Sequence, residues 1–207
     1  MTTRVVTIIG SGLTGPLLSL VLARRGFKVK LIERLPDIRK SNIYAGRSIN
    51  LALSLRGIKA LIEVEVFDQI QTNLIPMRGR MLHHRSGKEE FIPYSINPDE
   101  YINSVSREEL TKCLITAAEV TGKVDITFNC QVKSIDLSER CVHHDGGRIS
   151  VEFPLFGTDG AGSVVRSCIN QLIAQDSKYE PLGHGYKELT ILPGANNSFK
   201  LEQNALH

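Results

Sequence analysis

The first part of the chain has the hydrophobic pattern of a strand, a helix and a second strand. Residues 4–9 are apolar and β-branched after Arg4, without polar alternation, which predicts a central parallel strand covered on both faces. Residues 12–25 carry leucines at helical spacing, and Gly26 stands where a helix ends. Residues 28–33 predict the next strand, so the chain is expected to open with a βαβ unit.

The segments that follow are shorter. Residues 34–54 predict mostly loop, with an extended piece at Ile49–Leu53. A helix is expected from Arg56 to Val66, although Gly57 weakens it. Residues 80–93 predict a hairpin, with strands at Arg80–His84 and Glu89–Pro93 on either side of a turn at Ser86-Gly87.

The second half begins with a well-marked helix over residues 107–121. Ser106 and Glu109 form a capping box in front of it, and one of its faces is apolar. A run of short strands inside an α/β pattern predicts a parallel sheet that carries antiparallel insertions. These strands are expected at residues 124–128, 131–137, 140–144, 148–156 and 186–192.

The composition and charge of the chain limit the classes of function that are expected. The chain has 207 residues, 42% apolar and 23% charged, which is enough for a folded domain without disulfide or metal support. Its 25 basic and 22 acidic residues leave a net charge of +3, and no basic run is present, so no nucleic-acid partner is expected. No apolar run has the length of a membrane span. Four cysteines without a C-x-x-C pair predict reduced thiols, as in the cytoplasm.

The clearest chemical motif is G-S-G-L-T-G at residues 10–15, which matches G-x-G-x-x-G between the first strand and the first helix. Gly10 allows the tight turn, Gly12 lets a pyrophosphate approach the backbone, and Gly15 lets the helix pack on the sheet. Glu33 ends the second strand and can accept hydrogen bonds from the ribose hydroxyls of an adenosine. These residues predict an adenosine dinucleotide site. They do not separate FAD from NAD(H), but a carboxylate at the ribose disfavours NADP here.

Two further segments place polar residues next to strands. Residues 45–54, A-G-R-S-I-N-L-A-L-S, indicate by pattern alone a polar loop that enters a buried strand. Residues 157–163, G-T-D-G-A-G-S, form a glycine-rich turn before a helix. Asp159 in that turn either caps the helix or makes a second dinucleotide contact, and the pattern leaves both interpretations open.

Other reactive residues do not form a recognisable centre. His83-His84 and His143-His144 are adjacent pairs, and neighbours on a strand point to opposite faces, so neither pair predicts a metal site. No cysteine has the partners of a catalytic nucleophile.

Taken together, these motifs resemble the class A flavoprotein aromatic hydroxylases, and within them the group of kynurenine 3-monooxygenases. The resemblance implies an α/β fold of the glutathione-reductase type: a Rossmann-like, FAD-binding parallel sheet with an antiparallel substrate-side sheet that is incomplete here. Residues 1–175 are then the FAD-binding domain, with an inserted hairpin at about 76–106, and residues 176–207 begin the substrate-side sheet. The segments that carry the resemblance are 46–54, 76–81, 92–94, 104–107, 184–191 and 202–207.

The resemblance also assigns site residues. Arg80 and Tyr94 take the positions that hold the amino-acid carboxylate of L-kynurenine, which suits an arginine fork and a single phenolic donor. The FAD positions, including those of the glycine motif, are Gly10, Gly12, Thr14, Gly15, Ile32, Glu33, Arg34, Leu35, Arg47, Ala52, Arg107, Val132, Asp159 and Val164.

The implied reaction is hydroxylation of L-kynurenine to 3-hydroxykynurenine with FAD, NADPH and O2, in tryptophan degradation. Because the cofactor carries out this chemistry, no residue of the chain is expected to act as a catalytic acid or base. Members of that group are longer than this chain, and their second half completes the flavin pocket, so we expect the 207-residue chain alone to be inactive. The alternatives are an NAD-dependent dehydrogenase and a non-catalytic dinucleotide-binding fragment. The resemblance implies a cytoplasmic protein, or one at the mitochondrial outer membrane if a longer eukaryotic form carries an anchor.

Overall fold

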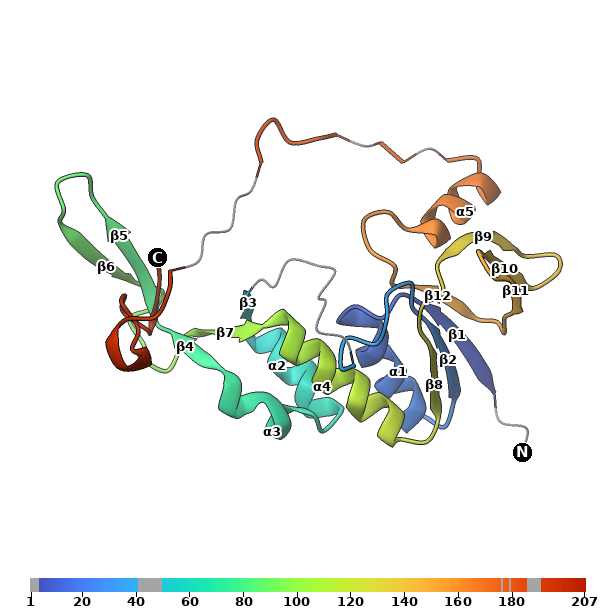
Figure 1. Ribbon diagram of the computed structural model, residues 1–207, viewed down its shortest axis with the longest axis horizontal. Helices are drawn as coiled ribbons and strands as arrows, with labels where there is room; N and C mark the ends of the chain where they lie inside the picture. Colours follow the sequence, from blue (N-terminus) through green and yellow to red (C-terminus); the bar gives the residue numbers. More distant parts are fainter. Residues whose placement is uncertain (1–3, 41–49, 176, 179, 186–190) are drawn as a thin grey trace.

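A four-stranded parallel sheet lies on one side of the molecule, towards the right in Figure 1. The computed structural model describes residues 4–40, 50–175, 177–178, 180–185 and 191–207. The strands of this sheet lie in the order β12-β1-β2-β8. Their bounds are Val5–Ile9 for β1, Lys28–Ile32 for β2, Val124–Thr127 for β8 and Leu155–Gly157 for β12.

Two helices cover one face of this sheet. They are α1, Thr14–Arg24, and α4, Arg107–Val120. Val6 and Ile8 of β1 are buried in the same core as Leu20 of α1 and Leu114 of α4. Because alternate residues of a strand point to opposite faces, this core uses only the even positions of β1.

An antiparallel unit covers the other face. Strands β9, Val132–Asp136, β10, Cys141–His144, and β11, Gly147–Ser150, lie in the order β11-β10-β9, and α5, Val164–Leu172, packs beside them. Ile9 at the end of β1 belongs to this second core, together with Val142 and Val165. Burial on both sides is the reason that residues 4–9 lack polar alternation, and it confirms the predicted central parallel strand.

The predicted strand over 148–156 is wrong, because it divides into β11 and β12. Pro154 lies between the two strands and has no N–H to donate to a ladder. Its carbonyl accepts from the N–H of Thr7, at 3.1 Å, and the chain then enters the parallel sheet beside β1. The segment predicted as one strand thus contributes to two different sheets.

A second antiparallel sheet is formed by two strands that precede the hairpin in sequence and one that follows it. It has the order β3-β7-β4, from Asn50–Leu53, Ile102–Ser106 and Ile75–Met77. The predicted helix from Arg56 to Val66 is instead α2, Leu55–Glu63, followed by α3, Phe67–Ile70, and the short η1, Gln71–Asn73. It ends early because Glu65 adopts a left-handed φ of 57°, which turns the chain so that Val64 and Val66 are both buried.

The predicted hairpin is confirmed as β5, Gly79–His83, and β6, Glu89–Pro93, and it extends away from the parallel sheet (Figure 1). Strand β13, Ala205–Leu206, pairs with β5 in parallel, and η2, Ala195–Asn197, precedes it. Of the strand predicted at 186–192, Ile191 and Leu192 are not in a strand, and the rest lies outside the described residues. No helix in the described ranges is long and apolar enough to cross a membrane.

Candidate functional site

Two glycine-rich turns meet at the carboxyl ends of β1 and β12. Gly10 has a φ of +100°, and a Cβ placed on it would lie 2.5 Å from the carbonyl oxygen of Thr158. The Thr158 hydroxyl donates back to the Gly10 carbonyl at 2.7 Å. The structure therefore confirms the predicted tight turn and adds a second reason for glycine, since the neighbouring turn leaves no room for a side chain.

The other two glycines of the motif have opposite surroundings. A Cβ on Gly15 would lie 2.0 Å from the Gly10 carbonyl oxygen, so the start of α1 is pressed against the turn. A Cβ on Gly12 would meet no atom within 4 Å. Gly12 thus leaves an open approach to the backbone, as expected for a ligand that comes close to it.

The N-terminus of α1 has no anionic side chain of its own. Leu13 at the N-cap makes no side-chain hydrogen bond, and the first turn contains no acidic residue. The N–H groups of a first helical turn have no partner within the helix, and the helix dipole gives them a partial positive charge. With Gly12 open beside it, this end of α1 suits a phosphate group.

Glu33 lies directly beside the glycine turn. Its Oε2 accepts from the N–H of Ser11 at 2.6 Å, and its Oε1 accepts from the N–H of Leu35 at 2.8 Å. Each carboxylate oxygen has further capacity to accept a hydrogen bond. The structure therefore places this carboxylate at the turn, where the motif predicts it, and its bond to a ribose stays a prediction.

The loop after Glu33 is held by an ion-pair network that the sequence analysis missed. Arg39 donates to Asp37 through Nε at 2.8 Å and Nη2 at 2.7 Å, and through Nη1 to Glu119 of α4 at 2.6 Å. The guanidinium lowers the pKa of the buried Asp37, and the bond to Asp37 in turn raises the pKa of Arg39. The D-x-R spacing of Asp37 and Arg39 is the one sequence signal for the two-bond contact between them. No sequence signal indicates the bond to Glu119, because Glu119 is distant in sequence.

Further predicted FAD residues lie along the same edge. The N–H groups of Asn129 and Cys130 donate to the carbonyls of Leu35 and Glu33, which brings residues 33–35 next to the start of β9. Val132 is buried there in the core against which Val164 packs. Burial also raises the pKa of the Cys130 thiol, which disfavours a reactive thiolate at this edge.

Asp159 acts as a helix cap. Its Oδ2 accepts from the N–H of Val164 at 2.7 Å, and its Oδ1 accepts from the Ser163 hydroxyl at 2.6 Å. The capping interpretation is therefore confirmed. The second interpretation, a dinucleotide contact, stays a prediction, although Asp159 does lie at the turn that packs on Gly10.

The remaining predicted FAD residues come from several different elements of the chain. Ala52 in β3 pairs with Ser104 in β7, and Arg107 is the exposed first residue of α4. Thr14 is exposed at the start of α1 and Arg34 is exposed directly after Glu33, whereas Arg47 lies outside the described residues.

Arg80 and Tyr94 lie on one face of the β5–β6 hairpin. Arg80 pairs with Ile92, and the N–H of Tyr94 donates to the carbonyl of Arg78, so Tyr94 is two residues along from the partner of Arg80. Residues two apart on a strand share a face, so this register lets both side chains reach one ligand. Both are exposed.

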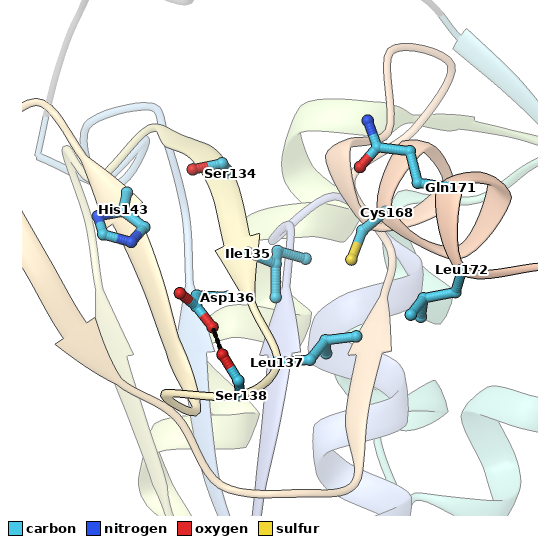
Figure 2. A pocket seen from close by; sticks show the side chains of 9 residues that line it. All are labelled: Ser134, Ile135, Asp136, Leu137, Ser138, His143, Cys168, Gln171 and Leu172. Carbon is cyan, nitrogen blue, oxygen red and sulfur yellow. Dashed lines mark hydrogen bonds between the residues drawn. The ribbon is translucent and has the colours of Figure 1, made fainter.

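A groove of about 470 Å³ separates β9 and β10 from α5 (Figure 2). Cys168 and Leu172 of α5 lie on one side of it, and Asp136, which accepts a hydrogen bond from Ser138 at 2.6 Å, lies on the other. The bonds to Ser138 lower the pKa of Asp136. None of the predicted FAD residues lines the groove. Across the described ranges, no three His, Cys, Asp or Glu residues gather as a metal site.

Solved structures of two oxygenases share this fold. The tetrameric form of 2-methyl-3-hydroxypyridine-5-carboxylic acid oxygenase is similar with a TM-score of 0.65 and 21% identity, over 82% of this chain and 43% of that one. The p-nitrophenol 4-monooxygenase PnpA from Pseudomonas putida DLL-E4 is similar with a TM-score of 0.63 and 20% identity, over 81% and 44%. At this identity the likeness shows the fold alone.

Relatives found by sequence are more similar to this chain than these two solved structures are. A kynurenine 3-monooxygenase from Myxococcus xanthus (strain DK1622) is 44% identical over 207 residues, which cover 98% of this chain and 45% of the relative. A kynurenine 3-monooxygenase from Dictyostelium discoideum is 39% identical over 203 residues, 98% of this chain and 44% of the relative. The resemblance to this group is confirmed, and the chain spans less than half the length of these relatives.

The match to a protein family agrees with the geometry of the turns. The FAD binding domain family matches residues 2–184, a range that contains both glycine-rich turns, Glu33 and the strands that position them. With that match over most of its length, this chain belongs to the FAD binding domain family.

Proposed function

We propose that this chain forms the adenosine-binding part of an FAD-dependent monooxygenase that hydroxylates L-kynurenine to 3-hydroxykynurenine with NADPH and O2. The observation that carries the proposal is the open turn at Gly12, which lies between the uncapped start of α1 and the Glu33 carboxylate. Relatives named kynurenine 3-monooxygenase, 44% and 39% identical over 98% of this chain, support the substrate.

The residues of the turns fit the adenosine end of FAD. The N–H groups at the start of α1 would bind the pyrophosphate, and Glu33 would accept from the ribose hydroxyls. When bound, FAD supplies the redox chemistry, taking hydride from NADPH and activating O2. The residues proposed to line the cofactor are Gly10, Gly12, Thr14, Gly15, Ile32, Glu33, Arg34, Leu35, Arg47, Ala52, Arg107, Val132, Asp159 and Val164.

Arg80 and Tyr94 are proposed to hold the amino-acid carboxylate of the substrate. An arginine binds a carboxylate through two parallel N–H bonds, and a tyrosine adds one O–H donor. Their shared face on the hairpin supports this role. They orient the substrate and move no proton, so they are positioning residues.

The fold supports a glutathione-reductase type of FAD domain. In this proposal, residues 1–175 form the FAD-binding part and residues 176–207 begin the substrate-side sheet, which β13 joins to the hairpin. The four free cysteines agree with the proposed cytoplasmic location. An NAD-dependent dehydrogenase is disfavoured, because the matching family is one of FAD binding domains.

Cofactor choice is tested by titrating the purified chain with FAD and with NADH, followed by flavin fluorescence and calorimetry. We expect FAD to bind and NADH to compete only weakly. Tight NADH binding without FAD binding would contradict the proposal.

Substrate choice requires the part that the longer relatives possess. We would fuse this chain to the remaining portion of the Myxococcus xanthus relative and measure 3-hydroxykynurenine formed from kynurenine, NADPH and O2. The fusion should form product, and Arg80→Ala should raise the KM for kynurenine about tenfold or more, for the loss of a charged hydrogen bond. The 207-residue chain alone should form none. A fusion that binds FAD but does not convert kynurenine would contradict the proposal that kynurenine is the substrate.

A further inference from the structure

Two histidine rings face each other where the C-terminal segment reaches the hairpin (Figure 1). His83 ends β5, and His207 directly follows β13. Their ring centroids are 5.2 Å apart, and Nε2 of His83 lies 2.9 Å from Nδ1 of His207, within hydrogen-bond distance. Both side chains are exposed, so they can exchange protons with the solvent. The bond between the two nitrogens needs one proton, which either ring can supply.

The outer nitrogen of each ring also has a partner. Nε2 of His207 lies 2.8 Å from the carbonyl oxygen of Glu202, and because a carbonyl only accepts, this nitrogen carries a proton. Nδ1 of His83 lies 3.1 Å from Oε1 of Glu89, and the carboxylate favours a proton there as well. In this arrangement the two rings hold three protons, one of them between the rings, and together carry one positive charge.

A fourth proton is incompatible with this contact. Both facing nitrogens would then carry hydrogens and neither could accept, so the bond between the rings would be lost. Two positive charges would also lie close together, and like charges repel. The contact therefore exists when the pair carries at most one charge, and it is lost when both histidines are charged.

The other charges of the hairpin lie on its opposite face, because neighbours along a strand point to opposite sides. They are Arg80, His84, Lys88 and Glu90. His84 forms its own pair with Glu90, at 3.0 Å from Nε2 to Oε2. In the C-terminal segment, the Glu202 carboxylate accepts from the N–H of Asn204 at 3.1 Å. Glu89 is thus the acidic side chain that contacts the histidine pair.

We propose that His83 and His207 form a proton-sensitive latch, which holds the C-terminal segment on the hairpin and releases it when both rings are charged. Histidine gains its charge at about pH 6.5 when its surroundings do not perturb it. The latch should therefore stabilise the packing above this range and be lost as the pH falls through it. Leu206, next to His207, pairs with Arg80, so the latch lies beside the strand that carries that arginine.

Hydrogen exchange at the Arg78 amide measures the latch, because this N–H donates to the carbonyl of Asn204, close to His207 in the chain. The original chain is compared with His207→Phe at a higher pH of about 7.5 and a lower pH of about 5.5. Comparison at equal pH cancels the intrinsic effect of pH on exchange. At the higher pH, exchange in His207→Phe should be about fivefold faster, for the loss of one hydrogen bond. At the lower pH, the two proteins should agree within about twofold.

His84→Phe is the matched control, because it removes the neighbouring histidine and its pair with Glu90 but leaves the latch. This variant should exchange like the original chain at both pH values, whereas His83→Phe should behave like His207→Phe. The carboxylate at the end of the chain is present in all four proteins and does not distinguish them. Nuclear magnetic resonance of the original chain gives a second measurement. A nitrogen–nitrogen coupling across the bond between the rings should be present at the higher pH and absent at the lower.

Equal exchange in the original chain and His207→Phe at the higher pH would overturn the proposal, because the rings would then not hold the segment. A difference that persists unchanged at the lower pH would also overturn it, as would a coupling that survives there, because the contact would then be insensitive to protons. No FAD or kynurenine is added in these measurements. Failure of the latch is therefore distinct from failure of the proposed function.

Discussion

Gly12 and Gly15 lie three residues apart, but glycine is needed at the two positions for different reasons. The position of Gly15 is set by packing, because its Cα faces the Gly10 carbonyl across the turn. The position of Gly12 is open and has room for a side chain in the protein alone. Glycine at 15 therefore serves folding, whereas glycine at 12 serves binding.

Alanine substitutions should separate these two roles. Gly15→Ala overpacks the turn, so we expect a loss of about 1–3 kcal/mol in the free energy of unfolding. Gly12→Ala should unfold like the original chain but bind FAD at least about tenfold more weakly, since a methyl group then occupies the phosphate approach. Urea unfolding and flavin titration measure the two effects. Equal destabilisation by both substitutions would contradict this division of roles.

Arg39 and Asp37 give a prediction about pH. Because the folded-state pKa of Asp37 lies below its ordinary value, the pair stabilises the fold above that value and loses this contribution as pH falls through the folded-state pKa. Arg39→Met should therefore cost about 2 kcal/mol at pH 7, and the difference from the original chain should shrink below about pH 3.8.

Chemical unfolding at several pH values checks this expectation. Lys40→Met is the matched control. Lys40 is exposed, and its single contact with Asp37, at 3.7 Å from Nζ to Oδ2, is longer than the two bonds from Arg39, so its loss should change stability little. A constant difference between Arg39→Met and the original chain from pH 7 to pH 3 would rule out the linkage.

At the level of elements, the capping box of α4 is only half formed. The Ser106 hydroxyl accepts from the N–H of Glu109 at 3.3 Å, as predicted. The Glu109 carboxylate, however, bonds Lys112 at 3.1 Å, and the contacts with Glu108 and Glu109 raise the pKa of that lysine. Ser106 is also the last residue of β7, so the helix starts directly from a strand.

Ser106→Ala should therefore cost about 1 kcal/mol in the free energy of unfolding, which is typical for a lost N-cap. Glu109→Gln should cost less than about 0.5 kcal/mol, because its ion pair is exposed. Thermal and urea unfolding of both variants give the comparison. A larger loss for Glu109→Gln than for Ser106→Ala would show that the carboxylate, and not the hydroxyl, caps the helix.

For the whole molecule, the last residues connect to a distant part of the sequence. The Asn204 side chain donates to the Pro76 carbonyl at 2.8 Å, and its own carbonyl accepts from the N–H of Arg78 at 2.8 Å. Ala205 is buried beside Gly79 in β5. The C-terminal segment thus packs on the hairpin that carries Arg80 and Tyr94 (Figure 1).

Asn204→Ala should loosen this packing. We expect hydrogen exchange at the Arg78 and Ala205 amides to become about tenfold faster, because one partly buried hydrogen bond is lost. The neighbouring exposed residue offers a control, and Gln203→Ala should leave both amides unchanged. Equal exchange rates in the original chain and in Asn204→Ala would exclude this role for the asparagine.

The sequence predicted local features well where neighbouring residues decide them. Residues 4–33 contain their own strand, turn and helix signals, and the hairpin over 80–93 has its own turn. The helix after Leu55 was predicted too long, because burial of Val64 and Val66 outweighs the helical pattern at Glu65. Residues 148–156 do not form the single strand that was expected, because their two halves pair with different strands.

By itself, the sequence determined the glycine turn, the nearby carboxylate and the residues to examine as a cofactor site, because these depend on spacings within one βαβ unit. Only the tertiary structure decided what crosses large distances in sequence. Packing brings the turn at Thr158 onto Gly10, joins Arg39 to Glu119, and places His207 beside His83. Such contacts form between segments that are distant in sequence and adjacent only in the fold, and no local pattern predicts them.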